Sequence, residues 1–444
     1  MLASAPVWAG PAILIAFGLA YLLVFTEEKF HVRKSKPVMI AAAFIWIFVA
    51  LAYRVQGREH EVAQKLNIVL LEYADLLLFL LSAMSFVNSM VERNVFEALR
   101  SRLLAARIST RALFWITGAI AFFLSPIADN LTTSLVMGTV VMSTLATDRK
   151  ALAAALVNIV IAANAGGAFS PFGDITTLMI WQKGAVEFHE FFKIFLPSLT
   201  AWLVPAAIIS CTLKNSMSYT EKHIINFHKG GSAVVVLFLL TIATTIFLDR
   251  ALDLPTFLGM MMGLGALSLY GHFLYGADMR ILAGAPDNPN GLKPFNIFSI
   301  MEKVEWDTLL FFYGVMLCIG GIGAIGYLGD LSSFLYVGLG ASVANILIGA
   351  FSSVVDNIPL TFAVLTMAPQ MDHGQWLLLT LMVGVGGSLL SIGSAAGVAL
   401  MGVGRGSYTF MSHLKWTWAI LLGVAASIGV HFFVNRDAFS GPLF

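Results

Sequence analysis

The sequence predicts an all-α polytopic membrane protein. We expect about ten crossing helices, two re-entrant hairpins and discontinuous helices, arranged in two inverted-topology repeats. Three observations support this prediction. The 444-residue chain is 58% hydrophobic and only 11% charged, whereas a soluble domain carries about 25% charged residues. Apolar runs of about 20 residues, the length that crosses a hydrocarbon core of about 30 Å, recur along the chain. Related motifs also occur in its two halves.

The first 65 residues (1–65) are expected to form an N-terminal helix pair. Its two apolar runs lie at 6–25 and 37–53. No Lys or Arg precedes the first run, so the basic segment of a cleaved signal peptide is missing. We therefore expect an uncleaved first span.

The first predicted repeat covers residues 66–213 and begins with a span at 66–90. The next stretch, 91–111, is amphipathic and contains five arginines. We expect it to lie as a helix on the membrane surface, against anionic lipids or at a dimer contact, and not to bind nucleic acid.

The polar motif SPIADNLTTS, at 125–134, interrupts the apolar sequence that follows. It divides a predicted hairpin at 112–146 into two arms, and the first arm, 112–124, would be about 20 Å long as a helix. Because this is shorter than the hydrocarbon core, the length favours a re-entrant hairpin. A predicted broken helix at 151–186, divided by NAGGAFSPFGD, follows it, and 191–213 crosses again.

The second half of the chain repeats this plan. Residues 214–304 are predicted to form a polar linker and connecting helices, and 305–436 the second repeat. That repeat contains a hairpin at 332–369 around SSVVDNIPLT and a broken helix at 376–404 around GVGGSLLSIGSAAG.

Matching segments occur in the same order in the two halves. DLLLFLLSAM resembles DTLLFFYGVM, ADNLTT resembles VDNIPL, and NAGGAFSPFGDITT resembles GVGGSLLSIGSAAG. The second match pairs Asp129 with Asp356, and the third pairs Gly166 with Gly386. Most Lys and Arg residues fall in the loops assigned to the inside, which places both termini outside and makes the copies antiparallel. Inverted repeats with paired broken helices are typical of secondary transporters, whose site lies near the midplane.

The breaks carry the chemistry of the predicted site. A carboxylate within a membrane costs at least about 2.5–3.5 kcal/mol, so we expect Asp129, Asp174 and Asp356 to be functional. A role as helix N-caps is the alternative for each of them. The tips and breaks contain no Lys, Arg or His. Their acidic, hydroxyl-rich composition indicates a site for small hard cations, with protons competing for the same carboxylates.

Four segments together, SPIADNLTTSLV, NAGGAFSPFGDITTLMIW, SSVVDNIPL and GSLLSIGSAAGVALMG, resemble the signature segments of NhaD-type sodium/proton antiporters of the ion-transporter superfamily. The resemblance covers roughly residues 75–418. It implies that cytoplasmic Na⁺ or Li⁺ is exchanged for external H⁺ by alternating access, in a multi-pass protein of a bacterial inner membrane. It also implies a homodimer, with no cofactor besides the transported ions.

The resemblance also implies the site. By motif, the ion ligands are Asp129, Thr132, Asp174, Asp356, Asn357, Ser391 and Ser394, with Na⁺ or Li⁺ at Asp129, Asp174 and Asp356, and with Ser125, Ser352 and Asp75 in support. The residue types of the breaks themselves add Asn130 as a ligand, and Asn164, Ser170 and Thr176 as supporting oxygen donors.

Other functions stay open at this point. The same fold could carry a sodium-coupled symporter of an anion such as a dicarboxylate, although such a site would normally show a cationic side chain or an unpaired helix N-terminus. Paired aspartates could also belong to an intramembrane aspartyl enzyme, but we recognise no catalytic motif and expect no enzyme activity. The histidines His60, His189, His223, His228, His373 and His413 are loop candidates for a pH sensor, and the sequence does not distinguish among them.

Overall fold

The computed structural model describes residues 8–26, 32–105, 108–145, 148–214, 225–284, 293–404 and 406–440; His223 lies outside them. The described chain is built of helices joined by short connections. Within it, nine helices are long and apolar enough to cross a membrane, or ten if one bent pair counts as a span. They are Ser35–Val55, His60–Glu92, Thr110–Ala128, Arg149–Ala168, Phe188–Cys211, Gly231–Leu252, Thr256–Gly284, Trp306–Ala324 and Thr417–Val434. This confirms the predicted all-α membrane protein, while the inverted repeats and re-entrant hairpins stay predictions.

The chain forms two compact units. Unit 1 comprises Met1–Leu99 and Ile224–Tyr327, and unit 2 comprises Arg100–His223 and Leu328–Phe444. Each unit therefore combines part of the first predicted repeat with part of the second.

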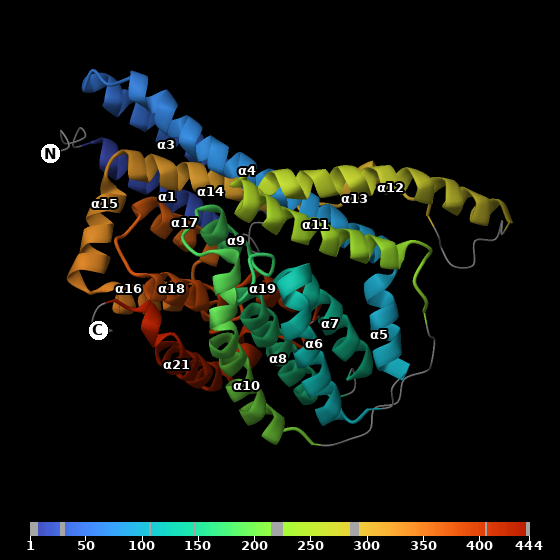
Figure 1. The fold of residues 1–444 in the computed structure, drawn as a ribbon. Helices are drawn as coiled ribbons and strands as arrows, with labels where there is room; N and C mark the ends of the chain where they lie inside the picture. The colour runs from blue at the N-terminus through green and yellow to red at the C-terminus, as the bar shows by residue number, and fades with distance from the viewer. Residues whose placement is uncertain are drawn as a thin grey trace. The chain divides into compact units, whose positions relative to one another are not determined.

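Unit 1 is a helical assembly (Figure 1). Its helices are α1 (Ala9–Phe25), α3 (Ser35–Val55), α4 (His60–Glu92), α11 (Gly231–Leu252), α12 (Thr256–Gly284), α13 (Ile297–Glu302) and α14 (Trp306–Ala324). Helix α14 packs against α3 and α4, and α11 pairs with α12. A Cβ added to Gly314 would lie 2.8 Å from the backbone nitrogen of Met39, so this glycine allows α14 to approach α3. The indole of Trp46 on α3 donates to the carbonyl of Leu317 at 2.9 Å.

Unit 2 contains the segments that the sequence predicts as hairpins and broken helices, and it too is helical (Figure 1). Its longer elements are α6 (Thr110–Ala128), α7 (Asn130–Thr144), α8 (Arg149–Ala168), α9 (Ile175–Gln182), α10 (Phe195–Cys211), α16 (Ala341–Phe351), α17 (Asn357–Met367), α18 (His373–Gly386), α19 (Ala395–Val403) and α21 (Thr417–Val434). The shorter ones are η1 (Phe188–Ile194), α15 (Tyr327–Ser332), η2 (Ser333–Gly338), α20 (Phe410–Leu414) and η3 (Arg436–Ala438). Helix α5 (Val95–Ala105) crosses the boundary between the units.

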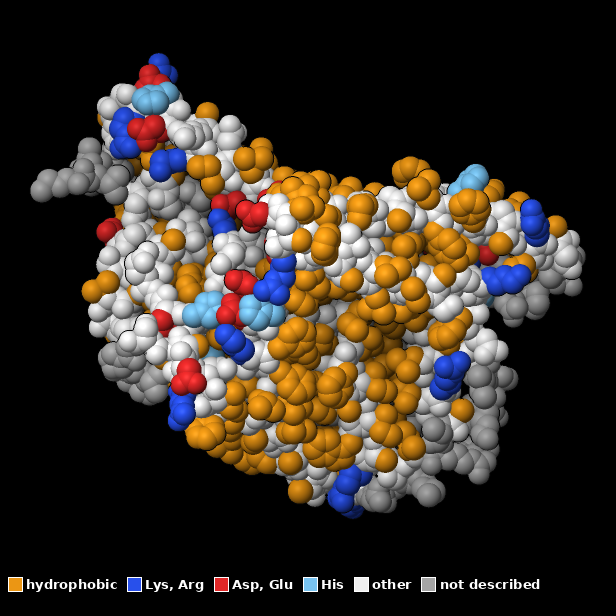
Figure 2. Space-filling model, in the orientation of Figure 1, with side chains coloured by type: hydrophobic (Ala, Val, Ile, Leu, Met, Phe, Trp, Pro, Cys, Tyr) orange, Lys and Arg blue, Asp and Glu red, His pale blue; other side chains and the backbone are white. Residues whose placement is uncertain are grey.

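The surface carries the apolar side chains that a membrane requires. Phe247 on α11, Phe273 on α12 and Phe433 on α21 are 62%, 72% and 79% exposed. Figure 2 shows apolar side chains over broad areas of the face drawn, with charged side chains gathered in separate groups. Lipid tails are the natural neighbours of such surfaces, which a monomeric soluble protein rarely exposes.

Two expectations about element lengths were wrong. Helix α6 runs through Pro126 to Ala128 and has 19 residues, about 28 Å at 1.5 Å per residue, so its length no longer favours a re-entrant arm. Helix α8 continues through the NAGG motif to Ala168, and the helix-free break is shorter than predicted. In both cases the sequence suggested an earlier end because proline and glycine usually stop helices, whereas a buried helix tolerates them where packing is tight.

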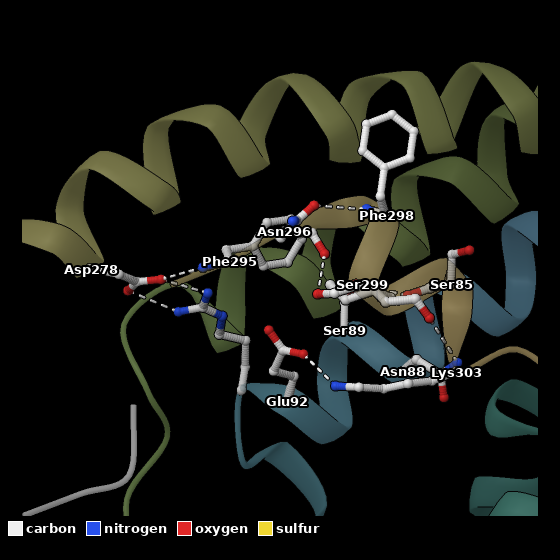
Figure 3. A network of polar contacts seen from close by, with 12 residues as sticks. Ser85, Asn88, Ser89, Glu92, Asp278, Phe295, Asn296, Phe298, Ser299 and Lys303 are labelled. Carbon is white, nitrogen blue, oxygen red and sulfur yellow. Dashed lines mark hydrogen bonds and ion pairs between the residues drawn. The ribbon is translucent and has the colours of Figure 1, made fainter. Parts of the chain in front are cut away.

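The expectation of one surface helix over 91–111 was also wrong. Helix α4 ends at Glu92, and the next residue, Arg93, is fully buried. Its guanidinium donates to both carboxylate oxygens of Asp278 on α12, at 3.0 and 2.7 Å, and lies over the ring of Phe295. The backbone N–H of Phe295 donates to Asp278 as well, as Figure 3 shows. Arg93 is buried because a partner 185 positions away neutralises it, which local sequence cannot reveal.

A second ion pair involves Glu92, the residue before Arg93. Lys303 donates to Glu92 at 2.8 Å, at the end of α4 (Figure 3). The bond from the Phe295 N–H to Asp278 and the Lys303–Glu92 pair hold the segment 293–303 against α12 and α4 within unit 1.

The buried pair makes a stability prediction. Asp278→Leu leaves the buried guanidinium of Arg93 without its ion-pair partner, which typically lowers the free energy of unfolding by about 3–5 kcal/mol. The thermal unfolding midpoint of the purified protein in detergent should therefore fall markedly. The double variant Arg93→Met with Asp278→Leu removes both charges and should recover part of that loss. It should not recover all of it, because the N–H of Phe295 still lacks its acceptor. An Asp278→Leu protein as stable as the parent would contradict this account.

Candidate functional site

Helices α7, α9, α17 and α19 of unit 2 all begin at side chains that the sequence placed in the site. Each of these side chains is the N-cap of its helix. The caps and their donors are Asp129 from Thr132 N (2.7 Å), Asp174 from Thr176 N (3.5 Å), Asp356 from Ile358 N (3.3 Å) and Ser394 from Gly397 N (3.2 Å). The three aspartates therefore do serve as helix N-caps, which was the alternative to an ion-binding role. A cap role does not exclude a ligand role, because an ionised carboxylate accepts at about four lone-pair positions.

Asp129 has an unusual backbone. It alone separates α6 from α7, with φ 57° and ψ 163°, a conformation that non-glycine residues rarely adopt and that costs about 1–3 kcal/mol. Its carboxylate accepts from both the N–H and the hydroxyl of Thr132, the latter at 2.9 Å. The two bonds hold the strained turn and fix the direction of the carboxylate.

The first break and the second hairpin tip are in direct contact. The side-chain amide of Asn357 donates to Asp174 at 3.0 Å, across 183 positions of sequence. Asp174 is buried, and Asp356, the neighbour of Asn357, repels it electrostatically. Helices α9 and α17, which begin at these residues, pack against each other. Two carboxylates and an amide thus gather in one place.

The first hairpin tip is joined to both broken helices. Asn130 donates its amide hydrogen to Asn164 of α8 at 3.3 Å, and Asn164 in turn donates to the hydroxyl of Ser388 in the second break at 2.9 Å. Helix α7 packs against α8 and α19, and α8 against α18. Both tip asparagines, Asn130 and Asn357, therefore use their NH₂ groups inside this network, which directs their side-chain oxygens elsewhere.

Most supporting hydroxyls bind the backbone around the breaks. Ser125 donates to the carbonyl of Ala163 at 2.6 Å, and Ser352 to that of Gly349 at 2.7 Å. Ser170 donates to the carbonyl of Pro126 at 2.9 Å. The carbonyl groups of bent or ending helices need such donors when they are buried.

Three other predicted residues have different surroundings. Ser391 donates to the sulfur of Met401 at 3.3 Å, and the Thr176 side chain is fully buried beside Asp174. Asp75 lies on α4 and belongs to unit 1.

Two buried hydroxyls of α7 were not among the assigned ion ligands, although the first tip motif contains both. Thr133 and Ser134 are fully buried, and within the described chain their hydroxyl oxygens have no hydrogen-bond partner. They share a helix face with Asn130, since residues three and four apart lie on one side. That spacing was the signal that could have identified them. A buried oxygen without a hydrogen-bond partner is suited to bind a water molecule or an ion.

The glycines of the NAGG and GVGG motifs form matching close contacts. A Cβ on Gly166 would lie 2.1 Å from the carbonyl oxygen of Phe122, and one on Gly386 would lie 2.0 Å from that of Gly349. Phe122 and Gly349 each precede their tip aspartate by seven residues. The contacts show why helix-disfavouring glycine is retained in α8 and α18: it lets the hairpin arms approach the broken helices.

These contacts predict which glycines tolerate alanine. Gly166→Ala and Gly386→Ala each place a methyl group inside a backbone carbonyl, so both should lower the thermal midpoint and the yield of folded protein. Overpacking of a core typically costs about 1–3 kcal/mol. Gly429→Ala in α21 is the control, because a Cβ there meets nothing within 4 Å, and it should be neutral or stabilising by up to about 1 kcal/mol. Equal tolerance at all three positions would show that the close approach is not required.

The known proteins that this chain resembles are all described as transporters. A family model described as a citrate transporter matches residues 12–384. The Na(+)/H(+) antiporter NhaD of Alkalimonas amylolytica is 49% identical, over 97% of this chain and 92% of that protein. NhaD of Vibrio cholerae serotype O1 is 50% identical, over 97% and 93%. Sodium/proton antiporter 1 of Arabidopsis thaliana is 30% identical, over 97% and 73%.

Proposed function

The chain belongs to the family of NhaD sodium/proton antiporters, and on that premise we propose that it exchanges cytoplasmic Na⁺ or Li⁺ for external H⁺ across a bacterial inner membrane. The observation that carries the proposal is the polar network of unit 2, where carboxylates and amides from both halves of the chain meet. Such exchange would serve pH homeostasis and salt tolerance.

We place the cation among the helix starts of unit 2. Hard cations prefer carboxylate, amide and hydroxyl oxygens, and these are the groups that the network presents. The proposed ligands are Asp129, Asn130, Thr132, Asp174, Asp356, Asn357, Ser391 and Ser394, with Ser125, Asn164, Ser170, Thr176 and Ser352 supporting the backbone around them. The supporting role of Asp75, a residue of unit 1, stays a prediction from the family resemblance.

Competition between Na⁺ and H⁺ follows from the same groups. A deprotonated carboxylate attracts Na⁺, whereas protonation removes its charge and occupies one of its acceptor positions. Because Asp174 and Asp356 repel each other, either a bound cation or a proton relieves that repulsion. The site is then occupied by Na⁺ or by H⁺ and not by both, which is the condition for antiport. Alternating exposure of the site to the two sides completes the cycle.

The inverted repeat is a proposal that the glycine contacts support. Gly166 and Gly386 meet equivalent positions of α6 and α16, as two copies of one structural plan would. A homodimer is likewise proposed from family resemblance, and cross-linking in the native membrane tests it.

A citrate-type anion suits this site less well. Helix N-termini attract anions through their free N–H groups and partial positive charge, but those of α7, α9, α17 and α19 are already capped by the protein's own oxygens. No Lys, Arg or His stands in the tips and breaks. A sodium-coupled anion symporter would require sodium-driven uptake of labelled citrate or dicarboxylate, which we expect to be absent.

An aspartyl enzyme is also not favoured. Such chemistry needs two carboxyl groups that share a proton, whereas an oxygen of Asp174 accepts from the amide of Asn357. The relatives are transporters by name.

Substitution of the proposed ligands tests the function. In vesicles holding a pH gradient, Na⁺ should dissipate the gradient through the parent protein, and Asp129→Asn, Asp174→Asn and Asp356→Asn should each abolish this. One unit charge at 4 Å is worth about 4 kcal/mol at an effective dielectric constant of 20, which corresponds to about a thousandfold in affinity. Asp437→Asn is the matched control, since its side chain is almost fully exposed, and it should retain activity.

Full activity in all three ligand variants would overturn the site. Absence of Na⁺-dependent dissipation in the parent protein would instead overturn the function.

A further inference from the structure

Two buried side chains near the C-terminus connect to the second break. Tyr408 and His413, the latter on α20, are both almost completely buried. The Tyr408 hydroxyl lies 2.7 Å from Nδ1 of His413, and Nε2 of His413 lies 2.8 Å from the carbonyl oxygen of Ser388. All three residues belong to unit 2, and the proposed exchange mechanism uses neither Tyr408 nor His413.

The directions of these hydrogen bonds can be assigned. A carbonyl oxygen only accepts, so Nε2 of His413 must carry a hydrogen. Nδ1 of the neutral ring is then an acceptor, and the Tyr408 hydroxyl donates to it. Burial disfavours the charged form of the ring, since His413 is completely buried. The ring is therefore neutral at physiological pH and holds the Ser388 carbonyl with a fixed tautomer.

A second series of hydrogen bonds runs from the candidate site and ends at the side chain of Ser388. The side chain of Ser388 accepts from Asn164, whose oxygen accepts from Asn130. Each hydrogen bond between Tyr408 and Asn130 thus has a defined donor and a defined acceptor. A rotation of Ser388 would remove the acceptor of Asn164 and release the amide of Asn130, whose oxygen is a proposed ion ligand.

This anchoring distinguishes the second break from the first. The carbonyl after Ser388, that of Leu389, accepts from Thr417 of α21 at 2.8 Å, so two consecutive carbonyls are held by side chains of the segment 408–417. The sequence alignment places Ala168 and Phe169 at the equivalent positions of the first break. In the described chain, no side chain donates to the carbonyls of Ala168 or Phe169.

We propose that Tyr408 and His413 are positioning residues for the cation site, and that they orient the Ser388–Asn164–Asn130 amide chain so that the Asn130 oxygen faces the ion. This inference rests on the proposed function, because it concerns the same site. Neither residue touches the ion: His413 acts through Ser388, and Tyr408 acts through His413.

The first test compares replacements of His413. Gln can place an amide N–H where Nε2 lies, whereas Asn reaches only the position of Nδ1 and Phe has no donor. The half-saturating Na⁺ concentration for exchange should rise about 3–10-fold in His413→Phe and His413→Asn, the range expected for one lost hydrogen bond. It should stay within about twofold of the parent in His413→Gln. Maximal rates and the midpoint of the pH profile should not change, because the neutral ring carries no transported proton.

The control is another buried histidine that binds a carbonyl. Nε2 of His431 on α21 contacts the carbonyl of Gly374 at 3.1 Å, near the start of α18 and away from its break. His431→Phe should lower the thermal midpoint without raising the half-saturating Na⁺ concentration. Tyr408→Phe keeps the side-chain volume but removes the donor to Nδ1. The half-saturating Na⁺ concentration should rise about 2–5-fold, because the tautomer of His413 is then no longer fixed.

Several results would overturn the proposal. One is a half-saturating Na⁺ concentration equal to that of the parent in both His413→Phe and Tyr408→Phe. Another is an equal rise of that concentration in His431→Phe. A third is the same concentration in His413→Gln and His413→Asn. A shifted pH midpoint in the His413 variants would mean proton carriage instead of positioning. If His413→Phe does not fold, Tyr408→Phe and the Gln and Asn pair decide the question. If the parent itself shows no exchange, the proposed function fails and not this inference alone.

Discussion

The start of a helix inside an apolar environment is the constraint on which this site depends. Four backbone N–H groups at such a start lack helical partners, and they carry a partial positive charge. Here α7, α9, α17 and α19 meet that requirement with Asp129, Asp174, Asp356 and Ser394. Because three of these caps are carboxylates, the helix starts bring negative charge to a place that would otherwise attract anions. In the site that we propose, the same groups that complete the backbone also select the ion.

The orientation of the amides is the second requirement. Asn130 and Asn357 each direct an NH₂ group to an oxygen of the first broken helix or its break. The tip asparagine is therefore the hydrogen-bond donor at both tips. At the second break the polarity is fixed further by side chains of α20 and α21. The two breaks therefore differ in how firmly they are held, although the sequence motifs that form them are related. A transporter needs such a difference if one half of the site moves more readily than the other.

The sequence predicted the membrane-protein class, the spans and the residues at the breaks, because hydropathy and polar interruptions are local signals. It did not predict the contact between Asn357 and Asp174, nor the pairing of Arg93 with Asp278, because both join residues more than 180 positions apart. It ended α8 too early since glycine usually disfavours helices, whereas Gly166 serves a contact with Phe122. His413 was one of several undistinguished loop histidines until its bond to Ser388 gave it a position.

In the proposed mechanism, Na⁺ and H⁺ compete for the carboxylates of unit 2. The most direct measurement is proton release when Na⁺ is added to the purified protein in weakly buffered detergent solution at near-neutral pH. A choline salt of equal ionic strength serves as the control. We expect protons to be released in proportion to the Na⁺ bound, and we expect Asp174→Asn to reduce the release. Calorimetric Na⁺ binding without any proton release over the active pH range would contradict it.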